Sequence, residues 1–283
     1  RCLVGSEMCI RDSLLNLMPT KVDTETQLAR VLGNTPLQIQ LELIAPSGHV
    51  SKNTSQEHML AFYRSFDEVR DRTFDGLIIT GAPVEQLAFE EVDYWDELVG
   101  IMDYAKKHVH ATLYICWGAQ AGLYHHYGIP KYGLPHKLSG IFSHTINDPT
   151  NQLFRGFDDV FHAPHSRHTE VRGEDIAKIP TLEILAESDE AGVLVAGTLD
   201  GRSMFITGHL EYDRDTLDAE YRRDVAKGVE IAPPAHYYPG DDVTRPPLVS
   251  WRAHAHLFYS NWLNYCVYQA TPYRLDDIPT DRD

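Results

Sequence analysis

One cysteine directly follows an apolar run that is typical of a buried strand. The run covers residues 111–115, and Cys116 is followed by a segment, 117–122, that contains two glycines and two alanines. This pattern predicts a sharp strand-to-helix turn that presents the thiol as a nucleophile, as in the nucleophile elbow. The N–H groups at the start of such a helix would favour the thiolate. The alternative is a buried structural cysteine, which an isolated strand Cys usually is.

A thiol nucleophile needs a base that accepts its proton and a carboxylate that orients the base. His209 and Glu211 offer both, because they follow an apolar strand and a glycine. A spacing of two residues puts both side chains on one face if the strand continues. We therefore predict a catalytic triad of Cys116, His209 and Glu211. The oxyanion hole would consist of the backbone N–H groups of Trp117 and Ala82.

Strands that alternate with helices must position these residues. We expect strands at 14–18, 37–44, 74–80 and 111–116, and helices at 21–32, 57–69, 90–107 and 117–127. This alternation predicts the α/β class, with a doubly wound, mostly parallel sheet that binds ligands at the carboxyl ends of its strands. Gly81 and Cys116 lie at such ends, so the active site should lie between them.

The second half of the chain is richer in strands. We expect them at 136–144, 160–162, 182–186, 192–199 and 203–207, and helices at 215–229 and 251–269. The sequence contains no internal repeat and no linker composition, so we expect a single domain over residues 14–283.

The first thirteen residues, 1–13, show no clean periodicity, lack an initiator Met and resemble a translated adapter sequence. We expect this segment to be non-native and the authentic N-terminus to be missing. Cys2 and Cys9 are therefore excluded from the functional reasoning.

Composition limits the partners of the chain. Its 283 residues include 25 basic and 41 acidic ones, and the net charge of −16 argues against nucleic-acid and anionic-membrane binding. No apolar run approaches the roughly 18 residues that a membrane span needs. Four cysteines without a CxxC spacing are typical of a reducing compartment, so we expect a cytoplasmic protein.

Several ordered motifs carry a resemblance to a known family. They are Asn16-Leu-Met-Pro-Thr-Lys21, Thr80-Gly-Ala-Pro83, Cys116-Trp-Gly-Ala-Gln120, His136-Lys-Leu-Ser-Gly140, Pro164-His-Ser-Arg167, Gly208-His-Leu-Glu211 and Tyr221-Arg-Arg-Asp224. The elbow cysteine with His-x-Glu resembles the class I glutamine amidotransferase fold. The full set of motifs resembles the homoserine O-acyltransferases of methionine biosynthesis, the homoserine O-succinyltransferase family.

This resemblance implies a ping-pong transfer from an acyl-CoA, through an acyl thioester on the cysteine, to the hydroxyl of L-homoserine. The substrate-contacting residues of the family match Lys137, Ser166 and Arg223, which would otherwise be ordinary surface charges and a turn serine. The position that correlates with the acyl donor holds Glu85, which implies acetyl-CoA because a carboxylate there would repel a succinyl group. The resemblance further implies a homodimer, with acetyl-CoA as co-substrate and no other cofactor.

Other interpretations remain open at this point. Succinyl-CoA is the alternative donor, and a glutamine amidotransferase-like hydrolase would use the same triad on an amide. A sensor that has lost turnover is a further alternative, although all three triad residues are present. Histidines at 162, 165 and 168 and at 254 and 256 have ligand-like spacing, but no cysteine or acidic cluster accompanies the first group, so we predict no metal site.

Overall fold

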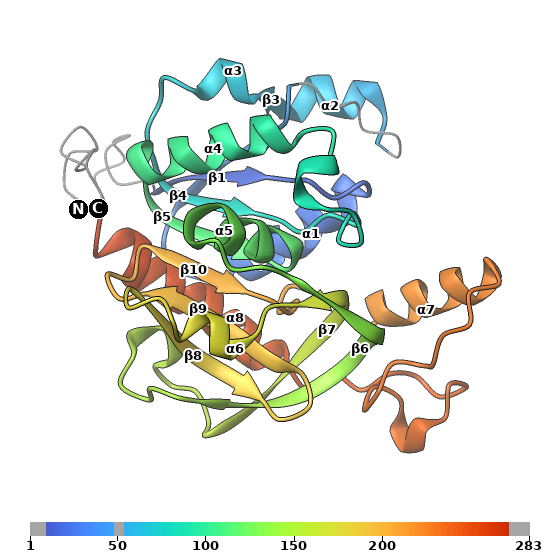
Figure 1. Cartoon of the computed structure of the whole chain (residues 1–283). Coiled ribbons are helices and arrows are strands. Elements are labelled where there is room, and N and C mark those ends of the chain that lie inside the picture. The colour runs from blue at the N-terminus through green and yellow to red at the C-terminus, as the bar shows by residue number, and fades with distance from the viewer. Residues whose placement is uncertain (1–9, 48–53, 272–283) are drawn as a thin grey trace.

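Ten strands form one mixed sheet at the centre of the molecule (Figure 1). The computed structural model describes residues 10–47 and 54–271. The parallel half contains, in spatial order, β3 (Tyr63–Ser65), β2 (Ile39–Ala45), β1 (Ile10–Leu15), β4 (Phe74–Ile79), β5 (Val109–Ile115) and β10 (Ser203–Ile206). The antiparallel half continues with β9 (Gly192–Thr198), β8 (Leu182–Ser188), β6 (Tyr132–Ile146) and β7 (Val160–Glu170). The predicted α/β fold is confirmed, with an antiparallel extension.

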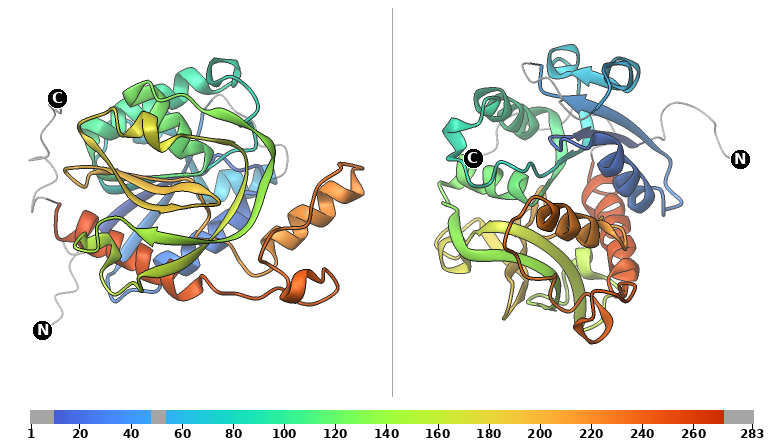
Figure 2. Two further views of the ribbon diagram at one scale, coloured as in Figure 1. Left: turned by 60° about the horizontal axis from the view of Figure 1, so that its bottom comes forward. Right: turned by 90° about the vertical axis from the view of Figure 1, so that its right-hand side faces the viewer.

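Helices cover both faces of the parallel half (Figures 1 and 2). One face packs against α4 (Trp95–His108) and α5 (Trp117–Tyr127), and the other packs against α1 (Lys21–Leu32) and α8 (Arg252–Asn261). Neighbouring strand residues therefore belong to different cores: Leu14 packs on the α1 and α8 side, and Leu15 on the α4 side. Burial on both faces explains why these strands are continuously apolar.

The remaining helices are short or lie at the edges. They are α2 (Gln56–Phe62), α3 (Phe66–Val69), α6 (Gly173–Ile176) and α7 (Thr216–Ala226), with single-turn segments at Phe89–Glu91, Gln152–Phe154 and Pro239–Asp241 and a π-helical turn at Trp262–Tyr268. In Figure 1, α7 stands out from the body beside the ends of β6 and β7. Across the described ranges, no helix combines the length and apolar character that a bilayer span requires.

The predicted helix over 57–69 is wrong. Two short helices flank β3, which pairs in parallel with the end of β2 and so adds an edge strand to the sheet. Ser65 ends the strand and caps α3, because the Glu68 carboxylate accepts from its backbone N–H at 2.8 Å. The helical periodicity of this segment is therefore overridden by sheet pairing.

The first strand begins earlier than predicted. β1 starts at Ile10 rather than at Leu14, and its residues pair with β2 and β4. Part of the segment that we expect to be non-native therefore lies inside the sheet, while residues 1–9 lie outside the described ranges. Within this strand Asp12 is completely buried, and neither of its carboxylate oxygens has a hydrogen-bond partner.

The strand that we predict at 160–162 is longer and includes Ser166, which we would otherwise expect in a turn. The strand β7 runs through this segment and pairs with β6 over most of its length. Pro164 is tolerated because β7 is the last strand of the sheet, where a missing N–H costs no interior ladder bond. Alternate residues, including His165 and Arg167, point into the protein and are buried.

Candidate active site

The predicted elbow lies between β5 and α5. Cys116 has φ 52° and ψ −117°, and α5 begins at the next residue. A positive φ at a non-glycine residue stores about 1–3 kcal/mol of strain, which the surrounding structure must offset. The backbone N–H of Cys116 donates to the Ile206 carbonyl at 2.6 Å, so the elbow is tied to the end of β10. The thiol is thereby held at the carboxyl edge of the sheet.

Two glycines permit the close approach of backbone around the elbow. A Cβ at Gly118 would lie 2.6 Å from the Thr80 carbonyl oxygen, so the helix can approach β4 only without a side chain there. A Cβ at Gly81 would lie 3.1 Å from the Cys116 Cβ and 3.5 Å from the backbone nitrogen of Trp117. The turn after β4 therefore lies directly against the nucleophile.

This turn carries one of the two backbone positions predicted for an oxyanion hole and lies beside the other, because a Cβ at Gly81 would be 3.5 Å from the backbone nitrogen of Trp117. Trp117 is the first residue of α5, and the first N–H groups of a helix lack intrahelical partners. Ala82 follows Gly81 in the adjacent turn and is buried. The position of the turn is thus compatible with two N–H groups that bind one oxygen beside the thiol.

His209 and Glu211 lie in a loop rather than on one face of a strand. The strand β10 ends at Ile206, so the condition that the strand continues to these residues is not met. The loop nevertheless brings the two side chains together, with His209 Nδ1 2.7 Å from Glu211 Oε1. The backbone N–H of His209 donates to the Pro164 carbonyl at 2.8 Å, which anchors the loop to β7.

The imidazole of His209 is buried between Cys116 and Glu211. Burial lowers the pKa of His209, but the charges and hydrogen bonds of Cys116 and Glu211 outweigh burial and hold the pKa well above 6.5. Since Nδ1 is bonded to Glu211, the Nε2 side is left for the thiol. Such a pair can exchange a proton between sulfur and nitrogen, as nucleophilic acyl transfer requires.

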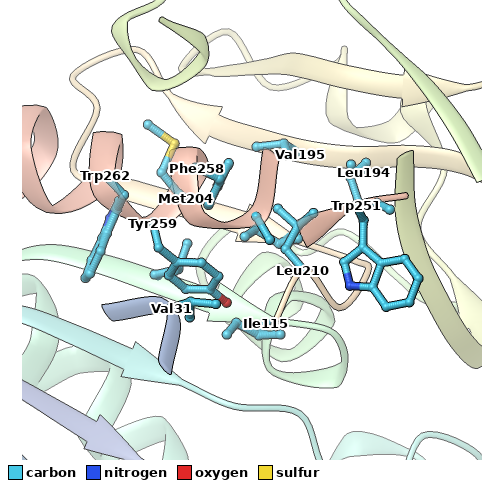
Figure 3. Packing of buried hydrophobic residues seen from close by; sticks show 14 of the residues in the cluster. Val31, Ile115, Leu194, Val195, Met204, Leu210, Trp251, Phe258, Tyr259 and Trp262 are labelled. Atoms are coloured by element: carbon cyan, nitrogen blue, oxygen red, sulfur yellow. The ribbon is translucent and has the colours of Figure 1, made fainter. Parts of the chain in front are cut away.

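Aromatic side chains from α8 and its N-cap hold the His209 loop in place. Trp251 Nε1 donates to the Tyr212 carbonyl at 3.1 Å, and the Tyr259 hydroxyl lies 3.5 Å from Glu211 Oε2. Figure 3 shows Trp251 and Tyr259 on either side of Leu210, the residue between the base and its carboxylate. The Tyr212 ring stacks on the imidazole at a centroid distance of 4.1 Å.

Lys137 and Ser166 converge on one carboxylate that the sequence did not single out. Lys137 Nζ lies 3.3 Å from Glu220 Oε2, and the Ser166 hydroxyl donates to the same oxygen. Tyr212 donates to Glu220 Oε1 at 2.9 Å. Lys137 also lies 3.3 Å from Asp224 Oδ2. This polar cluster joins α7 to β6 and β7 beside the ring that covers the imidazole.

Arg223 lies on α7 but is not part of the buried cluster. Its side chain is 54% exposed, and its Nε lies 2.8 Å from Asp224 Oδ1. The hydrogen bond to Asp224 raises the pKa of Arg223, and the nearby charge of Glu220 acts in the same direction. The helix therefore presents a cation and two carboxylates within about one turn.

Glu85 lies in the turn that follows β4, and it is linked to the elbow helix through Thr169. Its Oε2 lies 3.3 Å from the Thr169 nitrogen and 3.2 Å from the Thr169 hydroxyl, which is also 2.8 Å from Gln120 Oε1. Burial lowers the pKa of Arg167, and the electrostatic interactions with Cys116, Glu170 and Glu85 oppose that change. The guanidinium of Arg167 therefore interacts electrostatically with both the nucleophile and Glu85. A cavity of about 320 Å³ adjoins Glu85.

Among the described residues, the histidines with ligand-like spacing are not grouped closely enough with other ligand side chains to share an ion. In the described ranges, the group of side chains close enough to share an ion is Asp103, His125 and His126, near the end of α5 opposite Cys116. His165 instead pairs with His144, with their Nε2 atoms 3.1 Å apart.

Known proteins resemble this chain in sequence and in fold. The model of the homoserine O-succinyltransferase family matches residues 7–273. A homoserine O-acetyltransferase from Acetivibrio thermocellus is 60% identical over 269 residues, which are 95% of this chain and 88% of that protein. A homoserine O-acetyltransferase from Brevibacillus brevis is 61% identical over 268 residues, with the same coverage.

Solved structures share the fold at low sequence identity. A glutamine amidotransferase from Thermotoga maritima has a TM-score of 0.56 at 11% identity and covers 90% of this chain and 97% of its own. A glutamine amidotransferase from Methylobacillus flagellatus has a TM-score of 0.55 at 13% identity and covers 91% of this chain and 94% of its own. At this identity the likeness establishes the class I glutamine amidotransferase-like fold, and the family is established by the sequence matches.

Proposed function

The chain belongs to the homoserine O-succinyltransferase family, and we propose that it transfers an acetyl group from acetyl-CoA to the hydroxyl oxygen of L-homoserine. The observation that carries this proposal is the strained elbow, where a thiol faces an imidazole that a buried carboxylate orients. The acceptor and donor are taken from the names of relatives about 60% identical over 95% of this chain.

In the first half-reaction, the thiol proton of Cys116 resides on His209 Nε2 and the sulfur attacks the carbonyl carbon of acetyl-CoA. The oxyanion that forms accepts hydrogen bonds from the backbone N–H groups of Trp117 and Ala82. When the tetrahedral intermediate collapses, the carbon–sulfur bond to CoA breaks and the leaving thiolate takes the proton from the imidazolium. The product is an acetyl thioester on the enzyme, of nearly the same energy as the donor, together with free CoA.

In the second half-reaction, neutral His209 accepts the proton of the homoserine hydroxyl as its oxygen attacks the acetyl carbon. The new ester bond forms, the bond to Cys116 breaks, and the sulfur regains the proton from His209 or remains its ion-pair partner. Glu211 keeps the imidazole oriented through Nδ1 in both halves, with a contact of 2.7 Å. The acid and the base are thus one side chain in alternating protonation states.

The polar cluster between α7, β6 and β7, together with the exposed Arg223, suits an amino-acid acceptor. Homoserine carries an ammonium and a carboxylate, so its site needs groups of both signs close together. Arg223 and Lys137 supply cations for the carboxylate, and Glu220 and Asp224 supply carboxylates for the ammonium. Ser166 adds a neutral hydrogen-bonding group beside them.

The choice of donor rests on Glu85. A carboxylate in the acyl pocket would repel the free carboxylate of a succinyl group and occupy its space. Steady-state assays of CoA release test this choice, with L-homoserine as acceptor and acetyl-CoA or succinyl-CoA as donor. We expect kcat/KM to favour acetyl-CoA. A kcat/KM for succinyl-CoA equal to or above that for acetyl-CoA would contradict the donor assignment. Continued CoA release without homoserine, beyond the one equivalent that the first half-reaction produces, would contradict the transfer itself.

A further inference from the structure

A lysine outside the triad and the α7 cluster holds the Glu85 turn in place. Lys131 precedes β6, and its Nζ donates to the backbone carbonyls of Glu85 at 2.6 Å and of Leu87 at 2.5 Å. The same ammonium lies 4.4 Å from the centroid of the Phe89 ring. One cation therefore contacts three points of a segment of five residues.

The segment that Lys131 holds is otherwise attached at its two ends. At one end, the Glu85 carboxylate reaches Thr169 of β7 at 3.2 Å. At the other end, Phe89 stacks on Tyr124 at 4.5 Å and lies 6.0 Å from Trp117, the residue after the nucleophile. Between these ends, the described contacts of the turn are those of the lysine and a few local hydrogen bonds. Leu87 N–H donates to the Val84 carbonyl at 3.0 Å, Ala88 N–H donates to Glu91 Oε2 at 3.0 Å, and Glu91 N–H donates to the Ala88 carbonyl at 3.1 Å. Lys131 is therefore the contact that ties the middle of the turn to a distant part of the chain.

The charges around Lys131 favour its protonated form and its position. Partial burial lowers its pKa, and the carboxylates of Glu85, Glu90 and Glu91 oppose that change. A charged donor to a carbonyl forms a stronger hydrogen bond than a neutral donor does. The ammonium is thus suited to fix backbone rather than to bind a diffusing anion.

We propose that Lys131 is a positioning residue for acyl-donor selectivity, which acts by fixing the turn that carries Glu85. This inference rests on the proposed function. The cavity of about 320 Å³ that Glu85 and Lys131 line provides space into which a loosened Glu85 turn can move. Such a movement would withdraw the Glu85 carboxylate from Thr169, which links it to Gln120 of the elbow helix, and would leave room in the proposed acyl pocket for groups longer than acetyl. Substitution of Lys131 should therefore reduce the preference for acetyl-CoA over longer donors more than it slows acetylation by acetyl-CoA.

The test compares acylation of Cys116 by acetyl-CoA, propionyl-CoA and succinyl-CoA in the wild type and in Lys131→Met. We expect the acetyl-to-propionyl ratio of kcat/KM to fall about tenfold in Lys131→Met, roughly the effect of losing one hydrogen bond to a charged group. Propionyl-CoA separates the size of the acyl group from its charge. Lys131→Arg should restore the ratio, because a guanidinium keeps the charge and can donate to both carbonyls. Lys107→Met, at an exposed position near the end of α4, is the matched control.

Each outcome decides the proposal. An unchanged ratio in folded Lys131→Met would overturn it, and so would an equal loss for all donors, because a merely structural role affects them alike. Lys131→Gln provides the same comparison if the methionine variant does not fold. Wild-type protein that no donor acylates would instead contradict the proposed function. Acetylated wild type with an unaltered variant ratio would contradict this inference alone.

Discussion

Replacement of Asp12 by valine should stabilise the protein, and the gain should increase with pH. Asp12 is buried in β1, and its carboxylate oxygens have no hydrogen-bond partner within the described ranges. The side chain lies over Gly76, where an added Cβ would be 2.4 Å from Oδ1. Burial, and then the charge of Asp75, raise the pKa of the Asp12 carboxyl from 3.8 to about 8. Valine would remove the acid and suit the apolar environment.

The direction of the pH dependence follows from proton binding. Between pH 3.8 and about pH 8, the folded protein keeps a proton on Asp12 that the unfolded chain has released. Unfolding in this window therefore releases a proton, and rising pH lowers the free energy of unfolding. One pH unit corresponds to about 1.4 kcal/mol, so the penalty reaches about 4 kcal/mol near pH 7 and about 6 kcal/mol above pH 8. It no longer changes outside the window.

Urea unfolding of the wild type and Asp12→Val at pH 5 and pH 8.5 measures this effect. The difference in free energy of unfolding between the two proteins should grow by about 4 kcal/mol between these conditions, because other titrating groups cancel in the comparison. Asp12→Asn is the control. It lacks the titrating carboxyl, so its free energy of unfolding should differ from that of Asp12→Val by the same amount at both pH values. It keeps an unpartnered polar group, so its stability should lie below that of the valine variant. Parallel pH dependences of wild type and Asp12→Val would refute the reasoning.

Two further predictions concern the site. Glu211→Gln should lower kcat by about 10²- to 10⁴-fold, because the imidazole loses the charge that orients it and raises its pKa. A rate constant of acylation equal to that of the wild type, measured by stopped flow, would contradict this role. Glu220→Gln should raise the KM for homoserine about tenfold through the lost charge on the ammonium while it leaves the rate of acetylation by acetyl-CoA unchanged. Equal effects on both half-reactions would argue that Glu220 only supports α7.

The elbow could be predicted from sequence because its signal is local. An apolar strand that ends at Cys116 and continues into small residues constrains the backbone within a few positions, and the structure has this turn. The proximity of His209 to the thiol also followed, since both lie at carboxyl ends of neighbouring strands. Their contact nevertheless arises in a loop, which depends on the Pro164 carbonyl of a distant strand.

The features that the sequence did not reveal depend on tertiary contacts. Glu220 lies in a charged helical segment and has no local sign of a role; its partial burial arises only because α7 packs against β6 and β7. The residues around His165 are polar and follow a proline, which favours a turn, yet pairing with β6 makes them a strand. The short strand β3 is likewise stabilised by β2 rather than by its own propensity.

Intact-protein mass spectrometry after mixing with acetyl-CoA, without acceptor, tests the central claim most directly. The wild type should gain the mass of one acetyl group, Cys116→Ala should gain none, and addition of L-homoserine should discharge the adduct as O-acetylhomoserine. Folded wild type that gains no acetyl group, or an adduct that persists in Cys116→Ala, would contradict a reaction through an acetyl thioester at the elbow.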